Sequence, residues 1–143
     1  RRPGPGWPVP ERPPGAGGPG WGYERGRGRA AEGSVTAVFA ANDHIALGLL
    51  RALQQAGRRV PEDISVVGFD DMAETEYFGP SLTTVRQDFD ELGRRALHAL
   101  IEIVGDPDSG IPASGRRPHI VIPPSLVVRA SATRPRHRTE SPT

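Results

Sequence analysis

The chain has 143 residues, a formal net charge of +1 and no cysteine. This length suits one domain, and the near-zero charge gives no general electrostatic reason to bind nucleic acid or a membrane. The absence of cysteine excludes disulfides and thiolate metal sites, and no run of about 18 apolar residues is present to form a transmembrane helix.

The first 33 residues are rich in proline and glycine. Residues 1–20 alone contain seven prolines and six glycines. Such a composition predicts disorder, so we expect residues 1–33 to be a disordered Pro/Gly/Arg-rich segment. The interleaved Arg25, Arg27 and Arg29 leave an RNA-binding tail as an alternative, although a solvated linker is the simpler interpretation of only three arginines.

Order is predicted from residue 34 to about residue 130. Residues 35–41 form a continuous apolar run, which is typical of a strand buried on both faces. Apolar residues then recur at helical spacing until Gly57, which ends the helix. A second β-branched run follows at residues 64–69. Strand, helix and strand in this order predict a βαβ unit with parallel strands and a right-handed crossover.

The later elements are shorter or more broken. We expect residues 72–82 to form a loop or a broken helical turn, and residues 83–88 to form a short extended segment. A second helix is predicted from about residue 89 to 104, with Asp88 as its cap.

The C-terminal part contains adjacent prolines, Pro123 and Pro124, within an apolar stretch. Residues 119–129 therefore predict two short strands separated by a bulge or a step at the sheet edge. Residues 131–143 are polar and predict a loose tail. The predicted fold class is α/β, with one parallel-sheet βαβ lobe between residues 34 and 130.

Polar side chains follow the strands at the sheet edge where open parallel sheets bind ligands. Asn42 and Asp43 follow the first strand, Asp70 ends the second, and Gln87 lies at the end of the extended segment. Amide and carboxylate groups suit the neighbouring hydroxyls of a sugar. We therefore predict that Asn42, Asp70 and Gln87 bind a ligand. Asp43 and Phe89 are further candidates.

Each of these residues also has an ordinary structural explanation. Asn42 can simply cap the helix, Asp43 can interact with its dipole, and Phe89 can pack in the core. A cation site at Asp70 and Asp71 is a weaker alternative, because adjacent strand residues point to opposite faces. The sequence contains no nucleophile, phosphate-binding or cofactor motif, so we expect neither an enzyme nor a bound cofactor or metal.

Four motifs are specific in combination. They are A-N-D-x-x-A-L-G (41–48), V-P-x-D-I-S-V-V-G-F-D-D (60–71), L-T-T-V-x-Q-D (82–88) and P-x-S-L-V-V-R (123–129). Together they resemble the C-terminal part of the effector-binding domain of the LacI/GalR family of bacterial transcriptional regulators, over about residues 34–132. The resemblance implies a periplasmic-binding-protein-like fold, in which two α/β lobes close over a small ligand, usually a sugar.

The resemblance also implies a biological setting. It implies a cytoplasmic regulator that is a homodimer at full length and binds DNA through an N-terminal helix-turn-helix, which is missing here. It places effector contacts at Asn42 and Asp70, and it places Gln87 at the crossover between the lobes. A periplasmic sugar-binding protein of a transport system is the alternative.

Nearly all of the family's first lobe has no counterpart in this sequence, so we expect a truncated domain. In the family, the helix that matches residues 89–104 packs in that other lobe. We therefore expect Leu92, Ala96 and Leu100 to be partly exposed, which would favour self-association or low stability.

Overall fold

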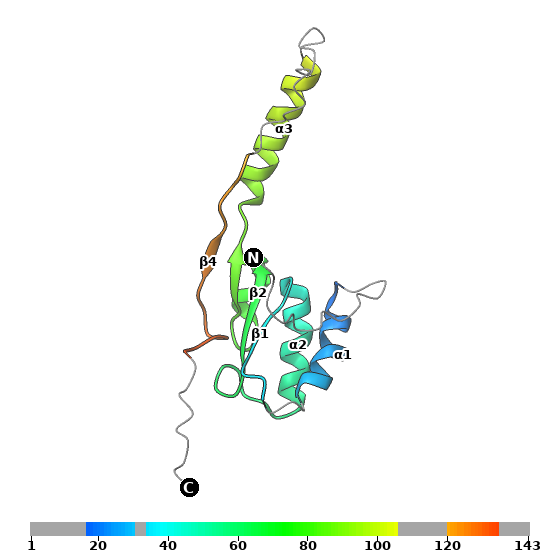
Figure 1. Cartoon of the computed structure of the whole chain (residues 1–143), viewed down its shortest axis with the longest axis vertical. Coiled ribbons are helices and arrows are strands. Elements are labelled where there is room, and N and C mark those ends of the chain that lie inside the picture. The colour runs from blue at the N-terminus through cyan, green and yellow to red at the C-terminus, as the bar shows by residue number, and fades with distance from the viewer. Residues whose placement is uncertain (1–16, 31–33, 106–119, 135–143) are drawn as a thin grey trace, which may run out of the picture.

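A small mixed sheet organises the molecule (Figure 1). The computed structural model describes residues 17–30, 34–105 and 120–134. The strands, in their order across the sheet, are β1 (Ala37–Phe39), β2 (Ser65–Asp70), β3 (Thr83–Arg86) and β4 (Ser125–Val127). The first three run parallel to one another, and β4 pairs with β3 in the antiparallel direction.

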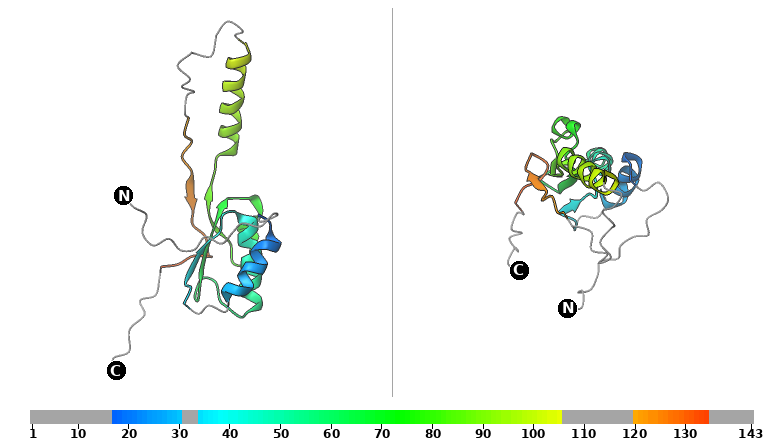
Figure 2. Two further views of the ribbon diagram at one scale, coloured as in Figure 1. Left: turned by 45° about the vertical axis from the view of Figure 1, so that its right-hand side comes forward. Right: turned by 90° about the horizontal axis from the view of Figure 1, so that it is seen from above.

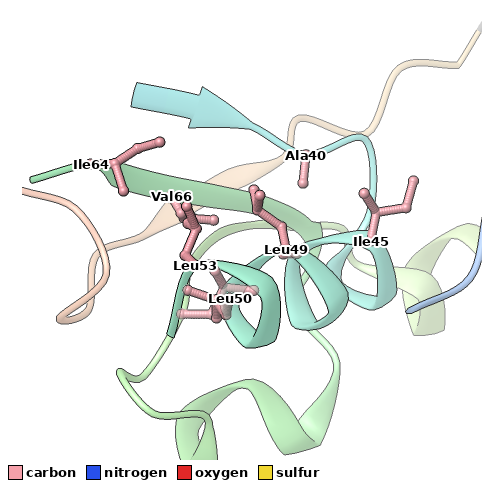
Figure 3. Close-up of a cluster of buried hydrophobic side chains, with 9 residues drawn as sticks. Ala40, Ile45, Leu49, Leu50, Leu53, Ile64 and Val66 are labelled. Atoms are coloured by element: carbon pink, nitrogen blue, oxygen red, sulfur yellow. The ribbon is translucent and has the colours of Figure 1, made fainter. Parts of the chain in front are cut away.

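Helix α2 (Asp43–Gln55) joins β1 to β2 and packs on one face of the sheet (Figure 2). Its apolar stripe meets the strands in a core that is drawn in Figure 3 and includes Ala40, Ile45, Leu49, Leu50, Leu53, Ile64 and Val66. After the helix, Gly57 adopts a φ of 71°, a left-handed conformation that costs glycine little. Because α2 connects two neighbouring parallel strands, β1 and β2, the predicted βαβ unit is confirmed.

The β3–β4 edge adds an antiparallel strand to the predicted parallel βαβ lobe. Helix α3 (Phe89–Gly105) leaves the sheet beyond the end of β3 (Figure 1). A chain that returns from that end to the neighbouring position must run in the opposite direction. The strand predicted before the prolines is also absent within residues 120–124, where Pro123 and Pro124 lack the amide hydrogen that a ladder needs.

The prediction of disorder up to residue 33 is wrong for α1 (Pro19–Ala30). This helix packs against α2, on the same side of the sheet (Figure 2). The parts of the predicted disordered segment at residues 1–16 and 31–33 lie outside the described residues.

Glycines explain why α1 forms despite its composition. Gly22 and Gly26 lie one turn apart and are both buried against α2. A Cβ on Gly22 would overlap the backbone of Ile45, and a Cβ on Gly26 would lie 2.7 Å from that of Ala52. The glycines thus allow a close helix–helix approach, and this tertiary packing outweighs their low helix propensity.

The domain also extends past residue 130, where a loose tail was predicted. Ser131 is fully buried. Its hydroxyl accepts a hydrogen bond from the Thr83 amide at 2.8 Å and donates to the Val66 carbonyl at 2.6 Å. The Thr133 amide also donates to the Ser65 hydroxyl at 3.2 Å, so residues 131–133 are attached to the sheet, and residues 135–143 lie outside the described part of the chain.

Helix α3 projects away from the sheet (Figure 1). Leu92 and Leu100 are 49% and 56% exposed, and Ala96 is also exposed, so the expected exposure of this helix is confirmed. Among the helices that the structure describes, none is long and apolar enough to cross a membrane.

Candidate functional site

A cleft of about 650 Å³ lies beyond the carboxyl ends of β2 and β3. Open α/β sheets bind ligands at this edge. The residues that line the cleft include Asp70, Asp71, Arg86, Gln87 and Phe89. Their elements explain the clustering, since β2 ends at Asp70, β3 ends at Arg86 and α3 begins at Phe89.

Asp70 and Gln87 meet in this cleft, as the sequence predicted. The Nε2 atom of Gln87 donates a hydrogen bond to Oδ1 of Asp70 at 2.8 Å. A carboxylate has about four acceptor positions, so Asp70 keeps capacity for ligand hydroxyl groups. Phe89 lines the same cleft and is 53% exposed, so its ring is on the surface and not in the core.

Asn42 is not among the residues that line the cleft. Its Oδ1 accepts from the Ile45 amide at 2.8 Å and caps α2. Its Nδ2 donates to the carbonyl of Gly17 at 3.0 Å, just before α1. The structure therefore brings Asp70 and Gln87 together, whereas the side chain of Asn42 holds the starts of two helices.

Asp43 is buried, with no exposed surface. Its Oδ2 accepts from the Met72 amide at 2.9 Å, and its Oδ1 accepts from the Thr84 hydroxyl at 2.6 Å. Both oxygens therefore accept hydrogen bonds inside the protein, and these bonds join α2 to β3 and to the turn after β2. This placement does not support Asp43 as an effector contact.

A cluster of charged residues that the sequence did not predict lies beside the cleft. The side chain of Asp71 is only 5% exposed and accepts from Nε of Arg86 and from Nη1 of Arg129, the latter at 2.8 Å. Asp70 and Asp71 thus face different partners, and no group of three or more potential metal ligands occurs in the described part of the chain. No sequence pattern signals the cluster, because residues 71, 86 and 129 are far apart in the chain and only the folded structure brings them together.

The ion pairs control the protonation of Asp71. Burial by itself would raise the pKa of this carboxyl group, but the hydrogen bonds from Arg86 and Arg129 outweigh it and hold the pKa below its ordinary value. The group therefore stays ionised at neutral pH.

Acid is expected to weaken the fold through Asp71. Its pKa is lower in the folded than in the unfolded state, where it is about 3.9, so the stabilisation is present above that value and is lost as the pH falls through the folded pKa. Urea unfolding of the wild type and of Asp71→Asn should therefore differ most above about pH 5 and converge as the pH falls through the lowered folded pKa of Asp71. Asp63 also has a lowered pKa, so some acid sensitivity will remain in the variant. A difference that is independent of pH would contradict this assignment.

The sequence matches the family described as periplasmic binding protein-like domain over residues 8–132. The chain belongs to this family. Its curated relatives confirm the expected LacI/GalR type. It is 42% identical over 96 residues to the HTH-type transcriptional repressor PurR of Haemophilus influenzae, covering 67% of this chain and 28% of that protein.

A second relative and two solved structures agree. The chain is 44% identical over 98 residues to the lactose operon repressor of Klebsiella pneumoniae, covering 68% of this chain and 26% of that one. A dimeric Lac repressor superposes with a TM-score of 0.70 at 34% identity, over 82% of this chain and 41% of the other. A LacI family regulator from Enterococcus faecium with bound ribose superposes with a TM-score of 0.69 at 31% identity, over 80% of this chain and 40% of the other. The chain thus has the periplasmic-binding-protein-like α/β fold. It spans less than a third of the length of the two curated relatives.

Proposed function

We propose that this chain is the effector-sensing part of a LacI-type transcriptional regulator and binds a small sugar-like molecule in the cleft of Asp70 and Gln87. The hydrogen bond of 2.8 Å between these two side chains carries the proposal, because it places an acceptor and an amide side by side at the ligand edge of the sheet. The ribose found in the Enterococcus faecium relative supports a ligand of this chemistry.

Each cleft residue has a defined task in this proposal. Asp70 accepts hydrogen bonds from ligand hydroxyls, and the amide of Gln87 both donates and accepts. The exposed ring of Phe89 offers an apolar surface to the C–H face of a sugar. No bond is made or broken, so the chain acts as a binding protein and not as an enzyme.

The ligand would act by shifting a conformational equilibrium. Gln87 directly precedes α3, so a ligand that holds Gln87 favours one arrangement of α3 relative to the sheet. In the full-length regulator, which we propose to be cytoplasmic and dimeric, this arrangement would control operator binding by the DNA-binding domain. The repressor names of the relatives favour this function over sugar transport.

Substituting Asp70 by alanine is expected to abolish stabilisation by the ligand. A sugar that binds only the folded chain and is present at about 100 times its Kd should stabilise it by about 2.7 kcal/mol. Thermal unfolding with a panel of pentoses and hexoses that includes D-ribose measures this effect. The matched control is Asp63→Asn, which removes a carboxylate in the turn before β2 and should keep the full shift.

The two parts of the proposal fail in different ways. A panel in which no sugar raises the unfolding midpoint of the wild type would refute the sugar-binding function. A midpoint shift that persists in Asp70→Ala would refute the assignment of the carboxylate while leaving ligand binding in place.

A further inference from the structure

We propose that Asp71 is a positioning residue that holds the Asp70–Gln87 pair in its binding geometry through ion pairs with Arg86 and Arg129. We call these three residues the Asp71 clasp. The proposal concerns how the cleft is built, and it applies whatever molecule the cleft binds.

The backbone beside the cleft needs such support. Asp70 has a φ of 116° and Asp71 a φ of 59°, so two consecutive non-glycine residues lie at positive φ. Such a backbone conformation is unfavourable for a residue with a side chain and persists only where its surroundings hold it. The next residue is also held, since the Met72 amide donates to buried Asp43. The turn that presents Asp70 is therefore fixed by contacts on both sides.

The clasp connects this turn to Arg86, the last residue of β3, which directly precedes Gln87. Asp70 and Arg86 are partners in the β2–β3 register. Asp71 and Gln87 directly follow the two strands, and their side-chain contacts run diagonally between the strand ends. Arg86 donates to Asp71, while Gln87 donates to Asp70. These two diagonal contacts link the same two pairs of neighbouring residues. Loss of the first contact therefore frees the backbone that supports the second.

Arg129 anchors the clasp to the body of the protein. Its side chain is 17% exposed, and its Nη1 lies 2.8 Å from Oδ1 of Asp71 and 2.8 Å from the carbonyl oxygen of Leu82. Arg86 is 56% exposed, and such an ion pair contributes little by itself in water. The carboxylate fixed by Arg129 presents its second oxygen to Arg86, so the exposed arginine gains a rigid partner.

The burial of Asp71 argues against direct ligand binding by its carboxylate. It is 5% exposed and each of its oxygens accepts from an arginine. Asp70 differs, since its hydrogen bond to Gln87 uses one oxygen of a cleft-lining carboxylate. The adjacent aspartates thus have different roles. Asp70 can accept hydrogen bonds from a ligand, and Asp71 holds the backbone that positions Asp70.

The side-chain amide of Gln87 reports directly on this arrangement. The chain has three glutamines and one asparagine, so an NMR spectrum contains only four side-chain amide groups. Gln87→Met identifies the signal of Gln87 by its loss. In Asp71→Asn we expect the Gln87 amide protons to exchange with water roughly tenfold faster, as the loss of one net hydrogen bond implies. The amide of Asn42, which caps α2, should be unchanged and serves as the internal reference.

The matched control is Asp63→Asn. It also removes a carboxylate paired with an arginine, at 2.6 Å from Arg59, but in the turn before β2 at the other end of that strand. Exchange at Gln87 should stay at the wild-type rate in this variant. If Asp71→Asn fails to fold, Arg86→Gln removes half of the clasp at an exposed position and should also accelerate exchange.

A folded Asp71→Asn with a lower unfolding midpoint but unchanged exchange at Gln87 would overturn the proposal, because Asp71 would then only stabilise the fold. Unchanged exchange in Arg86→Gln would overturn it equally. The measurement needs no ligand, so failure of the sugar panel leaves it intact. Conversely, sugar binding that depends on Asp70 but not on Asp71 would sustain the proposed function and refute the clasp.

Discussion

Replacing Gly48 by alanine is expected to destabilise the chain, although alanine favours a helix interior over glycine by about 1 kcal/mol. Gly48 lies in α2, where α1 crosses it. A Cβ at this position would overlap the carbonyl oxygen of Pro19 and lie 2.6 Å from the amide nitrogen of Tyr23. Both are backbone atoms, so relief requires α1 itself to move. We expect a net loss of about 1–3 kcal/mol, as overpacking usually costs.

The measurement is urea unfolding followed by tryptophan fluorescence. Trp21 lies on α1 and packs against the core, so its emission should shift to the red if α1 separates from α2. The only other tryptophan is Trp7, and a Trp7→Phe background leaves Trp21 as the single reporter.

Gly93→Ala is the matched control for Gly48→Ala. Gly93 is also within a helix, but a Cβ at this position would point into open space, with no neighbouring element within 4 Å. Alanine there should stabilise α3 by up to about 1 kcal/mol. If Gly48→Ala were also stabilising, the close packing of α1 on α2 would be wrong.

The same glycines show where sequence-based inference of this fold succeeds and fails. The stripe of α2 and the β-branched run of β2 are local patterns, and both were predicted. Helix α1 depends on contacts with residues of α2 that lie more than 20 positions away in the chain, so its glycines look like helix breakers when they are considered locally. The antiparallel direction of β4 likewise depends on the direction in which α3 leaves the sheet.

The candidate site shows the same division. The strand-end rule correctly brought Asp70 and Gln87 together. It also selected Asn42 and Asp43, because a helix that begins after a strand needs polar groups at the same edge for its own hydrogen bonds. Whether such a polar side chain caps a helix or binds a ligand depends on the hydrogen-bond donors that surround it in the fold. Those neighbours cannot be identified from the sequence alone.

Replacing Asp43 by alanine is expected to be among the most destabilising single changes in the described chain. It would leave the buried hydroxyl of Thr84 and the amide of Met72 without their acceptor, and each unsatisfied buried group costs about 1–3 kcal/mol. It would also open a cavity beside Gly68, whose missing side chain makes room for the carboxylate. We expect a total loss of about 2–5 kcal/mol.

Asp43→Asn separates the hydrogen bonds from the packing. The amide fills nearly the same volume and keeps one acceptor oxygen, so it should cost less than alanine. Asp90→Ala, at an exposed position in the first turn of α3, should change the unfolding free energy by no more than about 0.5 kcal/mol. Urea unfolding of the three variants tests this order of stabilities.

Ligand binding then distinguishes a structural Asp43 from an effector contact. A carboxylate with no exposed surface and both oxygens occupied cannot reach a molecule in the cleft. Any sugar that stabilises the wild type should therefore still bind the folded fraction of Asp43→Asn, because the Asp71 clasp also holds the turn that presents Asp70, while Asp70→Ala loses it. If Asp43→Asn stayed as stable as the wild type but no longer bound the sugar, Asp43 would be a ligand contact and its interior position would be wrong.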